Sequence, residues 1–325
     1  MFDLHCHILP GIDDGATDLP MALEMARMAA ADGITTVACT PHIYPGVYEN
    51  TAAAIRQAVA AFQAELDRHG IPLRLVEGAD VHLDPGLVAD IRGDRIPTLA
   101  GSRYLLLEPP HHVAPPRFEE AVFELMTAGY IPVITHPERL TWVDTHYPLF
   151  TRLSERGAWM QITAGALTGV FGRRAKYWGE RFLGEGHAHL LASDAHSAGR
   201  RKPELSPALD SARQLVGDEE ASRLVRERPR AVLDKINADL VTVLRQPEQR
   251  VDWFSASFLL MPAAVYRAVA GFDERYHMYC EDVDLCLRLQ LAGLRLTCSA
   301  ATAEHHAQRD SLRRWRPLLW HVHSL

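Results

Sequence analysis

Histidine and carboxylate side chains follow nearly every stretch of the sequence that is predicted to form a β-strand. Parallel strands bring such positions to one face, so residues far apart in the chain could share metal ions there. His5 and His7 alternate along one strand and should therefore point to the same side of it. The full set is His5, His7, His42, Asp80, Glu108, His136, Asp194 and His196.

Such a mixture of imidazoles and carboxylates suits the hydrolysis of a phosphate ester. Clustered cations neutralise the phosphate charge and can lower the pKa of a bound water from about 16 towards about 7. Imidazole binds zinc, iron and manganese, and several carboxylates shift the preference towards manganese. Arg139 and Arg201 follow two of these positions and could grip phosphate oxygens in bidentate fashion. Each residue alone could equally be an ordinary structural or surface residue, so only the set indicates a site.

Composition excludes several other classes of function. A net charge of -7 gives no broad basic field for nucleic acid. No window approaches the roughly 18 consecutive apolar residues of a membrane span, and Met1 leads into a predicted strand without a secretory signal, so we expect a cytoplasmic protein. The cysteines contain no CxxC pair, and none begins the Cys-x5-Arg loop of thiol-based tyrosine phosphatases. They are Cys6, Cys39, Cys280, Cys286 and Cys298.

Repeated βα units are predicted to position these side chains. Asp18 can cap a helix through about Ala31, with a strand over Ile34 to Thr40 and a second helix over about Thr51 to His69. About seven parallel strands result, which makes this an α/β protein and favours a closed or nearly closed barrel. A doubly wound fold is the alternative that the sequence does not exclude. The later strands are expected at Leu73 to Ala79, Tyr104 to Leu107, Ile131 to Thr135, Met160 to Thr163 and His189 to Ser193.

The pattern of βα units ends near residue 240. Residues 241–251 are polar around Pro247 and are predicted to form a linker. Residues 252–325 would then form a separate, smaller piece.

The motifs in the first part of the chain resemble those of the polymerase-and-histidinol-phosphatase (PHP) superfamily, and within it the bacterial capsule-associated tyrosine phosphatases. This resemblance implies a distorted barrel, a centre of up to three metal ions, and hydrolysis of phosphotyrosine on the tail of a bacterial tyrosine kinase that controls polysaccharide export. The motifs are Asp3-Leu-His5-Cys-His7-Ile-Leu-Pro-Gly-Ile-Asp13-Asp14-Gly15, Thr40-Pro-His42, His136-Pro-Glu-Arg139, Gln161-Ile-Thr-Ala-Gly165 and Ser193-Asp194-Ala-His196.

The resemblance also implies a distribution of ligands. His5, His7 and Asp194 should hold one ion, Asp80 should bridge to a second ion completed by Glu108 and His136, and Asp14, His42 and His196 should hold a third. The bridging residue is normally glutamate in this family, and Asp80 is one methylene shorter. Activity, metal count or metal preference could therefore differ here, and a noncatalytic binding module is the alternative if Asp80 prevents assembly.

The last part of the chain resembles the acceptor-side half of inverting GT-A glycosyltransferases. In Glu281-Asp282-Val-Asp284, the position of the catalytic base would be Asp282. The nucleotide-binding half of such an enzyme has no counterpart, so the expected fold is a small α/β fragment. The alternatives to a tyrosine phosphatase are a glycosyltransferase of surface polysaccharides and another PHP phosphoesterase such as histidinol phosphatase. The sequence leaves the oligomeric state open.

Overall fold

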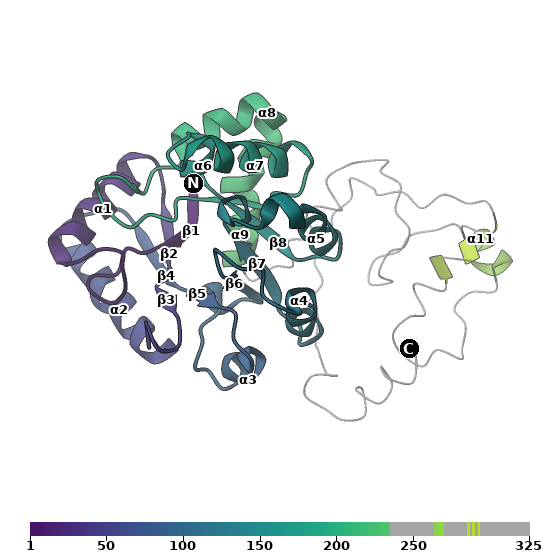
Figure 1. Ribbon diagram of the computed structural model, residues 1–325, viewed down its shortest axis with the longest axis horizontal. Coiled ribbons are helices and arrows are strands. Elements are labelled where there is room, and N and C mark those ends of the chain that lie inside the picture. Colours follow the sequence, from purple (N-terminus) through teal and green to yellow (C-terminus); the bar gives the residue numbers. More distant parts are fainter. Residues whose placement is uncertain (235–262, 270–284, 287, 290–291, 293–325) are drawn as a thin grey trace. The chain divides into compact units, whose positions relative to one another are not determined.

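The protein is described by a computed structural model that covers residues 1–234, 263–269, 285–286, 288–289 and 292 (Figure 1). The chain separates into two compact units, Met1–Ala238 and Asp239–Leu325. The predicted linker, Asp282 and most of the predicted glycosyltransferase-like fragment lie outside the described residues. In the second unit, α11 (Ala263–Ala268) contributes Val265 to a small apolar cluster with Leu285 and Leu289.

The first two helices begin where the sequence predicts them. The Asp18 carboxylate accepts a hydrogen bond from the Met21 amide and caps α1 (Leu19–Ala31). The Thr51 hydroxyl does the same for α2 (Ala52–Arg68), accepting from the Ala54 amide. These caps are local, since they lie within three residues of the amides they satisfy, and both helices are confirmed.

All pairs of named strands in the first unit are parallel. One sheet has the order β1 (Phe2–Cys6), β2 (Thr36–Cys39), β4 (Arg74–Glu77). The other has the order β3 (His42–Ile43), β5 (Asp80–His82), β6 (Tyr104–Glu108), β7 (Ile131–Thr135), β8 (Trp159–Thr163), β9 (Leu190–Ala192). A single parallel bridge between Cys6 and Ala195 links the end of β1 to the segment after β9.

The prediction of about seven strands, with His42 and Asp80 at strand ends, is wrong in one respect. Both residues instead begin the short strands β3 and β5, and they pair with each other. The chain leaves one sheet and enters the other just before each of them. Gly78 allows this close passage, because a Cβ there would lie 2.9 Å from side-chain atoms of Thr40 and Leu99.

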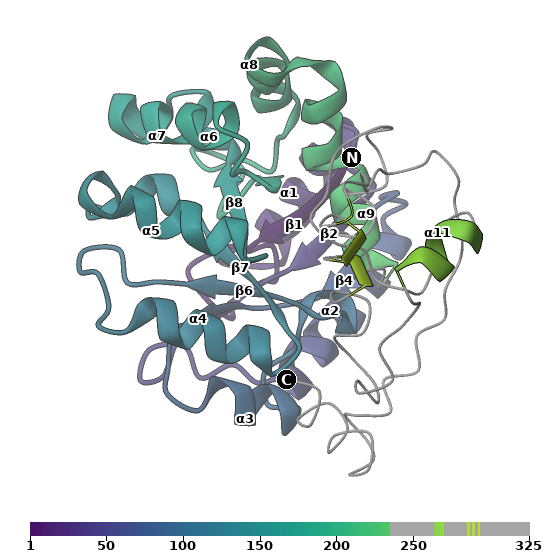
Figure 2. The same cartoon turned by 90° about the vertical axis from the view of Figure 1, so that its right-hand side faces the viewer.

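Helices lie around the outside of the strands in both views of this unit (Figures 1 and 2). They include α3 (Leu87–Arg92), α4 (Phe118–Thr127), α5 (Val143–Glu155), α6 (Ala164–Leu167), α7 (Gly172–Gly184), α8 (Ser206–Val225) and α9 (Glu227–Leu233). Short 3-10 turns occur at Leu99–Gly101 and Pro137–Arg139. Among the described residues, no helix has the length and apolar character needed to cross a bilayer.

Strand β6 shows how the core is divided. Leu105 and Leu107 belong to the large apolar cluster shared with the helices, whereas Tyr104 and Leu106 point to the opposite face. That second face forms a smaller cluster with side chains of β1, β2, β7, β8 and β9, and residues of α9 pack into it. The carboxyl ends of the same strands carry the polar residues described next.

Candidate metal centre

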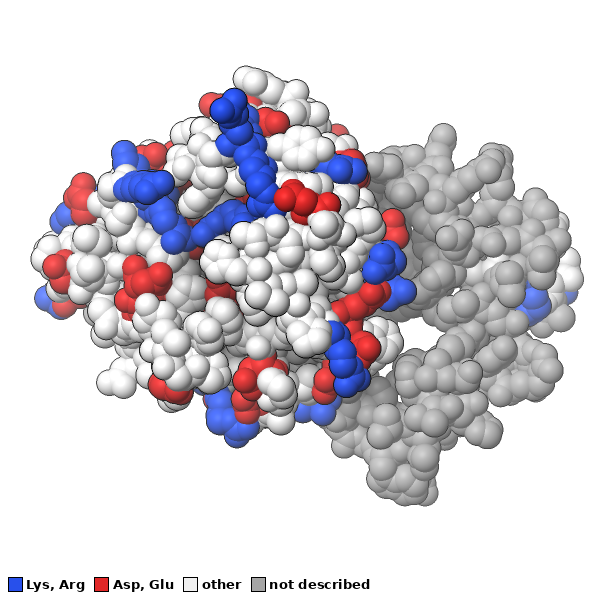
Figure 3. All heavy atoms as spheres, viewed as in Figure 1, with Lys and Arg blue, Asp and Glu red and all other residues white. Residues whose placement is uncertain are grey.

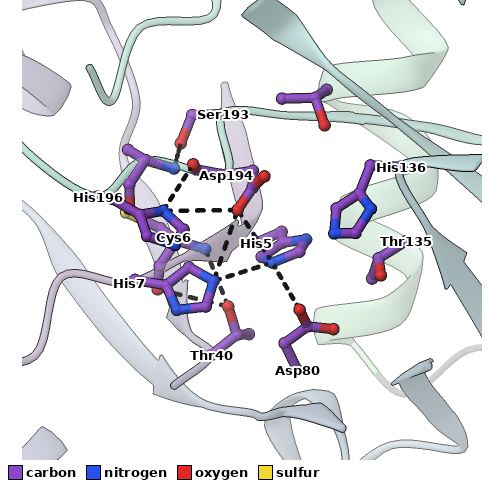
Figure 4. A network of polar contacts seen from close by, with 12 residues as sticks. His5, Cys6, His7, Thr40, Asp80, Thr135, His136, Ser193, Asp194 and His196 are labelled. Atoms are coloured by element: carbon purple, nitrogen blue, oxygen red, sulfur yellow. Dashed lines mark hydrogen bonds and ion pairs between the residues drawn. The ribbon is translucent and has the colours of Figure 1, made fainter. Parts of the chain in front are cut away.

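The metal ligands predicted from the sequence gather in one cluster, which is buried except at Asp14, whose side chain is 47% exposed, and at the partly buried His42. His5 and Asp80 are fully buried, and His7 and Asp194 are each only 1% exposed. Figure 4 shows the imidazoles of His5, His7 and His196 turned towards the Asp194 carboxylate. Such burial is costly for charged groups unless they are paired or coordinate a cation.

His5 and His7 point to the same place, as their alternation on β1 predicts. Their Nε2 atoms are 3.1 Å apart. Asp194 Oδ1 lies 3.4 Å from His5 Nε2 and 3.5 Å from His7 Nε2, while Asp80 Oδ2 lies 3.4 Å from His5 Nε2. Four potential ligands therefore converge on one point.

The second nitrogen of each ring has a partner that sets its orientation. His5 Nδ1 lies 2.9 Å from Gln161 Oε1, and His7 Nδ1 lies 2.7 Å from Asp13 Oδ2. The other oxygen of Asp13 accepts a hydrogen bond from the Gly15 amide. Partners of this kind direct Nε2 towards a metal. Sequence reasoning gave Asp13 and Gln161 no such role, although both lie within the quoted motifs.

The three residues predicted to hold a third ion also lie close together. Asp14 Oδ1 lies 3.5 Å from His42 Nε2 and 3.4 Å from His196 Nε2. With His7, these residues offer ligand atoms that all lie within 4.8 Å of one another.

Glu108 and His136 lie close together at the ends of β6 and β7, but the third residue of this group is His111 and not the predicted Asp80. Ligand atoms of Glu108, His111 and His136 lie within 4.8 Å of one another, whereas Asp80 groups with Glu108 through His42. His111 was missed by sequence reasoning, as was His82, whose Nε2 lies 3.0 Å from Glu108 Oε2. The only signal for His111 was its place three residues after Glu108.

Unsatisfied polar atoms test whether a metal fits here. Neither carboxylate oxygen of Asp80 makes a hydrogen bond of good geometry within the described part of the chain, nor does Glu108 Oε2, although imidazole nitrogens lie 3.0 to 3.5 Å from Glu108 Oε2 and Asp80 Oδ2. Buried polar atoms without partners are rare in native proteins. Because these are carboxylate oxygens facing imidazoles, bound cations would supply the missing partners, and the residues present fit a metal centre.

Backbone geometry at two of the ligands is unusual. His136 has a φ of 36° and Asp194 a φ of 51°. Side chains other than glycine rarely adopt this left-handed region, and it persists where surrounding contacts enforce it. At Asp194 those contacts include a 2.8 Å hydrogen bond from its own amide to the His5 carbonyl.

Electrostatics in the cluster centre on Asp194. Arg139 and Arg201 both donate to its Oδ2, the latter at 2.5 Å. Burial disfavours a charged His7, but the carboxylates of Asp13 and Asp194 outweigh this effect and raise the pKa of His7 to about 10. Cys6 lies between the two histidines, and burial raises the pKa of its thiol, so it remains protonated.

The two arginines also share an aromatic neighbour. The guanidinium carbon of Arg139 lies 4.4 Å from the centre of the Phe171 ring, and that of Arg201 lies 5.8 Å from it. A cavity of about 310 Å³ adjoins them, lined among others by Phe171, Arg200 and Lys202. In the view of Figure 3, several Lys and Arg side chains gather in the upper part of the first unit. The region beside the cluster is therefore suited to an anion.

Comparison with known proteins identifies the family to which this sequence is similar. Residues 1–234 match the sequence family described as "Capsular polysaccharide synthesis, CpsB/CapC". The tyrosine-protein phosphatase YwqE of Bacillus subtilis is 36% identical over 255 aligned residues, and the alignment covers 77% of this chain and 96% of YwqE.

The fold is also similar to a solved one. The crystal structures of YwqE from Bacillus subtilis and CpsB from Streptococcus pneumoniae, described as unique metal-dependent tyrosine phosphatases, include a chain that matches with a TM-score of 0.70 and 35% identity. The match covers 73% of this chain and 96% of that one. A stretch of 76 aligned residues is 46% identical to the rhamnosyltransferase WbbL of Escherichia coli, covering 23% of this chain and 29% of WbbL.

Proposed function

The chain belongs to the CpsB/CapC family of capsular polysaccharide synthesis, and we propose from this and from its buried cluster that it is a metal-dependent protein-tyrosine phosphatase. The observation that carries the proposal is the arrangement of unsatisfied carboxylates and imidazoles directly beside Arg139 and Arg201. Relatives that match the same part of the chain are tyrosine-protein phosphatases. A phosphate monoester is the substrate class for which such a site is suited.

Up to three manganese ions are the proposed cofactor, with iron or zinc as alternatives. Bound cations would neutralise the phosphate charge and make hydroxide available near neutral pH. His5, His7 and Asp194 would hold one ion and Asp14, His42 and His196 another, while Glu108 and His136 would bind at the remaining position. Asp80, whose Oδ2 lies 3.4 Å from His5 Nε2 and 3.5 Å from His42 Nδ1, would contribute an oxygen between these positions. The many carboxylates favour manganese over softer ions.

Arg139 and Arg201 would bind the phosphate oxygens. Their planar guanidinium groups present paired N–H donors that match phosphate geometry. In the structure both donate to one oxygen of Asp194, which holds them beside the cluster, and the Phe171 ring packs against them. The chain therefore holds the two guanidinium groups in place before substrate arrives, and this saves the entropic cost of ordering them on binding.

We extend the proposal to the fold of the enzyme and to its substrate in the cell. The two parallel sheets would form the distorted barrel that the motifs predict, since side chains from six strands meet in one inner cluster. The enzyme would be cytoplasmic, and its substrate would be the phosphorylated tail of a bacterial tyrosine kinase that controls capsule or exopolysaccharide export. The family match to capsular polysaccharide synthesis supports this setting.

Hydrolysis of synthetic phosphopeptides tests the proposed activity. The purified chain, supplied with Mn²⁺, should release phosphate from a tyrosine-rich phosphotyrosine peptide at least about 100-fold faster, in kcat/KM, than from the matched phosphoserine peptide or from histidinol phosphate, a difference of about 3 kcal/mol in transition-state binding. Preferred hydrolysis of histidinol phosphate would instead assign the chain to the other phosphoesterase class.

Replacing Arg139 by lysine should lower kcat/KM by about 10- to 100-fold. Lysine keeps the charge but presents a single point of contact in place of a planar two-point grip, and loss of one such contact commonly costs a few kcal/mol. The measurement is steady-state hydrolysis of a phosphotyrosine peptide. Arg174→Lys is the matched control, because Arg174 also pairs with an aspartate, Asp144, but does so at the surface. Wild-type kinetics for both variants would show that Arg139 pairs with Asp194 without binding the substrate phosphate.

The rest of the chain gives a second candidate function. We assign the stretch that resembles WbbL to the C-terminal part of the chain, where the Glu281-Asp282 motif lies. We propose that residues 252–325 form a piece separate from the phosphatase domain of residues 1–240. A glycosyltransferase activity acting through Asp282 would need a nucleotide-sugar site that this piece is too short to supply.

A chain truncated after Leu240 should therefore fold and keep phosphatase activity within about twofold of the full-length protein. Every proposed ligand and both arginines precede that point, and few contacts are expected across a linker. Peptide hydrolysis and calorimetric titration with nucleotide sugars should be measured on both proteins. Loss of hydrolysis in a folded truncated chain, or tight binding of a nucleotide sugar to the full-length chain, would contradict this division.

A further inference from the structure

His111 contacts the metal cluster from a loop rather than from a strand. Its Nε2 lies 3.5 Å from Glu108 Oε1, and His136 Nε2 lies 3.6 Å from the same oxygen. The centres of the His111 and His136 rings are 4.8 Å apart. Two imidazoles and one carboxylate oxygen thus surround a common point at the end of β6 and β7.

The spacing of these atoms suits a bound cation. Ligands about 2.0–2.1 Å from a tetrahedral metal are separated by roughly 3.3 Å from one another. The two measured separations, 3.5 and 3.6 Å, differ from that value by a few tenths of an ångström. They are too long for hydrogen bonds of good geometry between a carboxylate and an imidazole.

Glu108 divides its two oxygens between two sets of neighbours. Oε2 lies 3.0 Å from His82 Nε2 and 3.4 Å from His42 Nδ1, while Oε1 faces His111 and His136. The His82 ring is itself stacked on Tyr44, with ring centres 3.7 Å apart. The contacts on Oε2 hold the carboxylate so that Oε1 stays directed at the two imidazoles.

The loop that carries His111 is fixed to the neighbouring segment by its backbone. The His111 carbonyl accepts hydrogen bonds from the amide and the hydroxyl of Thr141, at 2.9 and 3.1 Å. The Trp142 indole N–H donates to the Pro110 carbonyl at 2.9 Å. None of these contacts uses the His111 side chain, so the ring is placed at the cluster but left available to bind a metal.

We propose that His111, Glu108 and His136 together bind one divalent cation, with His111 as its third protein ligand. The inference rests on the proposed metal-dependent function and deepens it. Asp80 was expected to complete this position. Its ligand atoms instead lie within 4.8 Å of those of His5 and His7, and of those of His42 and Glu108. Two imidazoles with one carboxylate and an open position are a ligand set that zinc adopts in hydrolytic sites, so this position should prefer Zn²⁺ more than the carboxylate-rich positions do.

Partial exposure is consistent with an open coordination position. The His111 side chain is 29% exposed, compared with 3% for His136 and 7% for Glu108. Solvent therefore reaches the position from the His111 side, where a metal could enter.

Metal binding by two neighbouring alanine variants tests the proposal. Apo wild type, His111→Ala and His112→Ala should be titrated with Zn²⁺ by calorimetry and with Co²⁺ by visible absorption. His112 is the matched control, because it is the adjacent histidine and is exposed. We expect His111→Ala to lose one bound ion, or to bind it at least about tenfold more weakly, with a changed Co²⁺ spectrum. His112→Ala should titrate as the wild type does.

Folding and function are checked separately. Thermal unfolding of the apo proteins should give the same midpoint for both variants, since the anchoring bonds of the loop are made by the backbone. His111→Asp, which offers an oxygen ligand, should recover the lost ion in part. Identical stoichiometry and affinities within about threefold for wild type and His111→Ala would overturn the proposal. Phosphotyrosine hydrolysis by the wild type is measured alongside, so that failure of the proposed function is seen independently of His111.

Discussion

Asp194→Asn is expected to reduce kcat/KM for a phosphotyrosine peptide by at least about a thousandfold. Removing a single preorganised electrostatic contact from an active site commonly costs about 10²–10³ in rate, and this carboxylate makes several. It faces the Nε2 atoms of His5 and His7 through Oδ1, and it accepts from Arg139 and Arg201 through Oδ2. The change therefore removes a proposed metal ligand and loosens both arginines.

Asparagine is the informative replacement at this position. Asp194 has a positive φ, which asparagine tolerates as readily as aspartate, so the variant should keep the local backbone. Asp144→Asn serves as the matched control, because Asp144 also accepts from an arginine but is half exposed. Metal content should fall in Asp194→Asn and stay unchanged in the control. Turnover within a few-fold of wild type would show that Asp194 is not a ligand.

The parts of the molecule that the sequence predicted well are those set by local chemistry. The cap at Asp18 acts within its own first turn, and the alternation of His5 and His7 follows from the geometry of a single strand. Long strands such as β7 and β8 carry enough consecutive apolar residues to be recognised, and the structure has them where they were expected.

The parts that escaped prediction depend on contacts between distant segments. β3 and β5 contain only two and three residues, too few for any periodic pattern, and they exist because His42 and Asp80 pair with each other. His111 lies in a loop whose position is fixed by Thr141, and no local signal reveals that contact. Likewise, the arginines were expected to meet phosphate, whereas their shared partner Asp194 follows only from the tertiary fold.

Exhaustive chelation should abolish hydrolysis, and added Mn²⁺ should restore it better than other divalent ions do. The ligand set is imidazole and carboxylate without thiolate, which favours manganese over softer ions, and every ligand must give up any bound proton to coordinate it. The raised pKa of His7, about 10, means that protons compete with metal at neutral pH. Recovery should therefore be more complete at pH 8 than at pH 6, since fewer protons have to be displaced there.

Removing the metal should also destabilise the fold, because it leaves the buried Asp80 and Glu108 carboxylates with only imidazole neighbours to offset the cost of burying their charge. Ligand present at 100 times its dissociation constant stabilises a protein by about 2.7 kcal/mol, so thermal unfolding should shift downward by several degrees on chelation. Chelator that has been saturated with Mn²⁺ beforehand is the control, since it separates metal removal from binding of the anionic chelator at the arginines. Hydrolysis that survives chelation, in protein shown by mass spectrometry to hold no metal, would refute the metal mechanism. An unfolding midpoint that does not move would show instead that the surrounding imidazoles satisfy Asp80 and Glu108 without a cation.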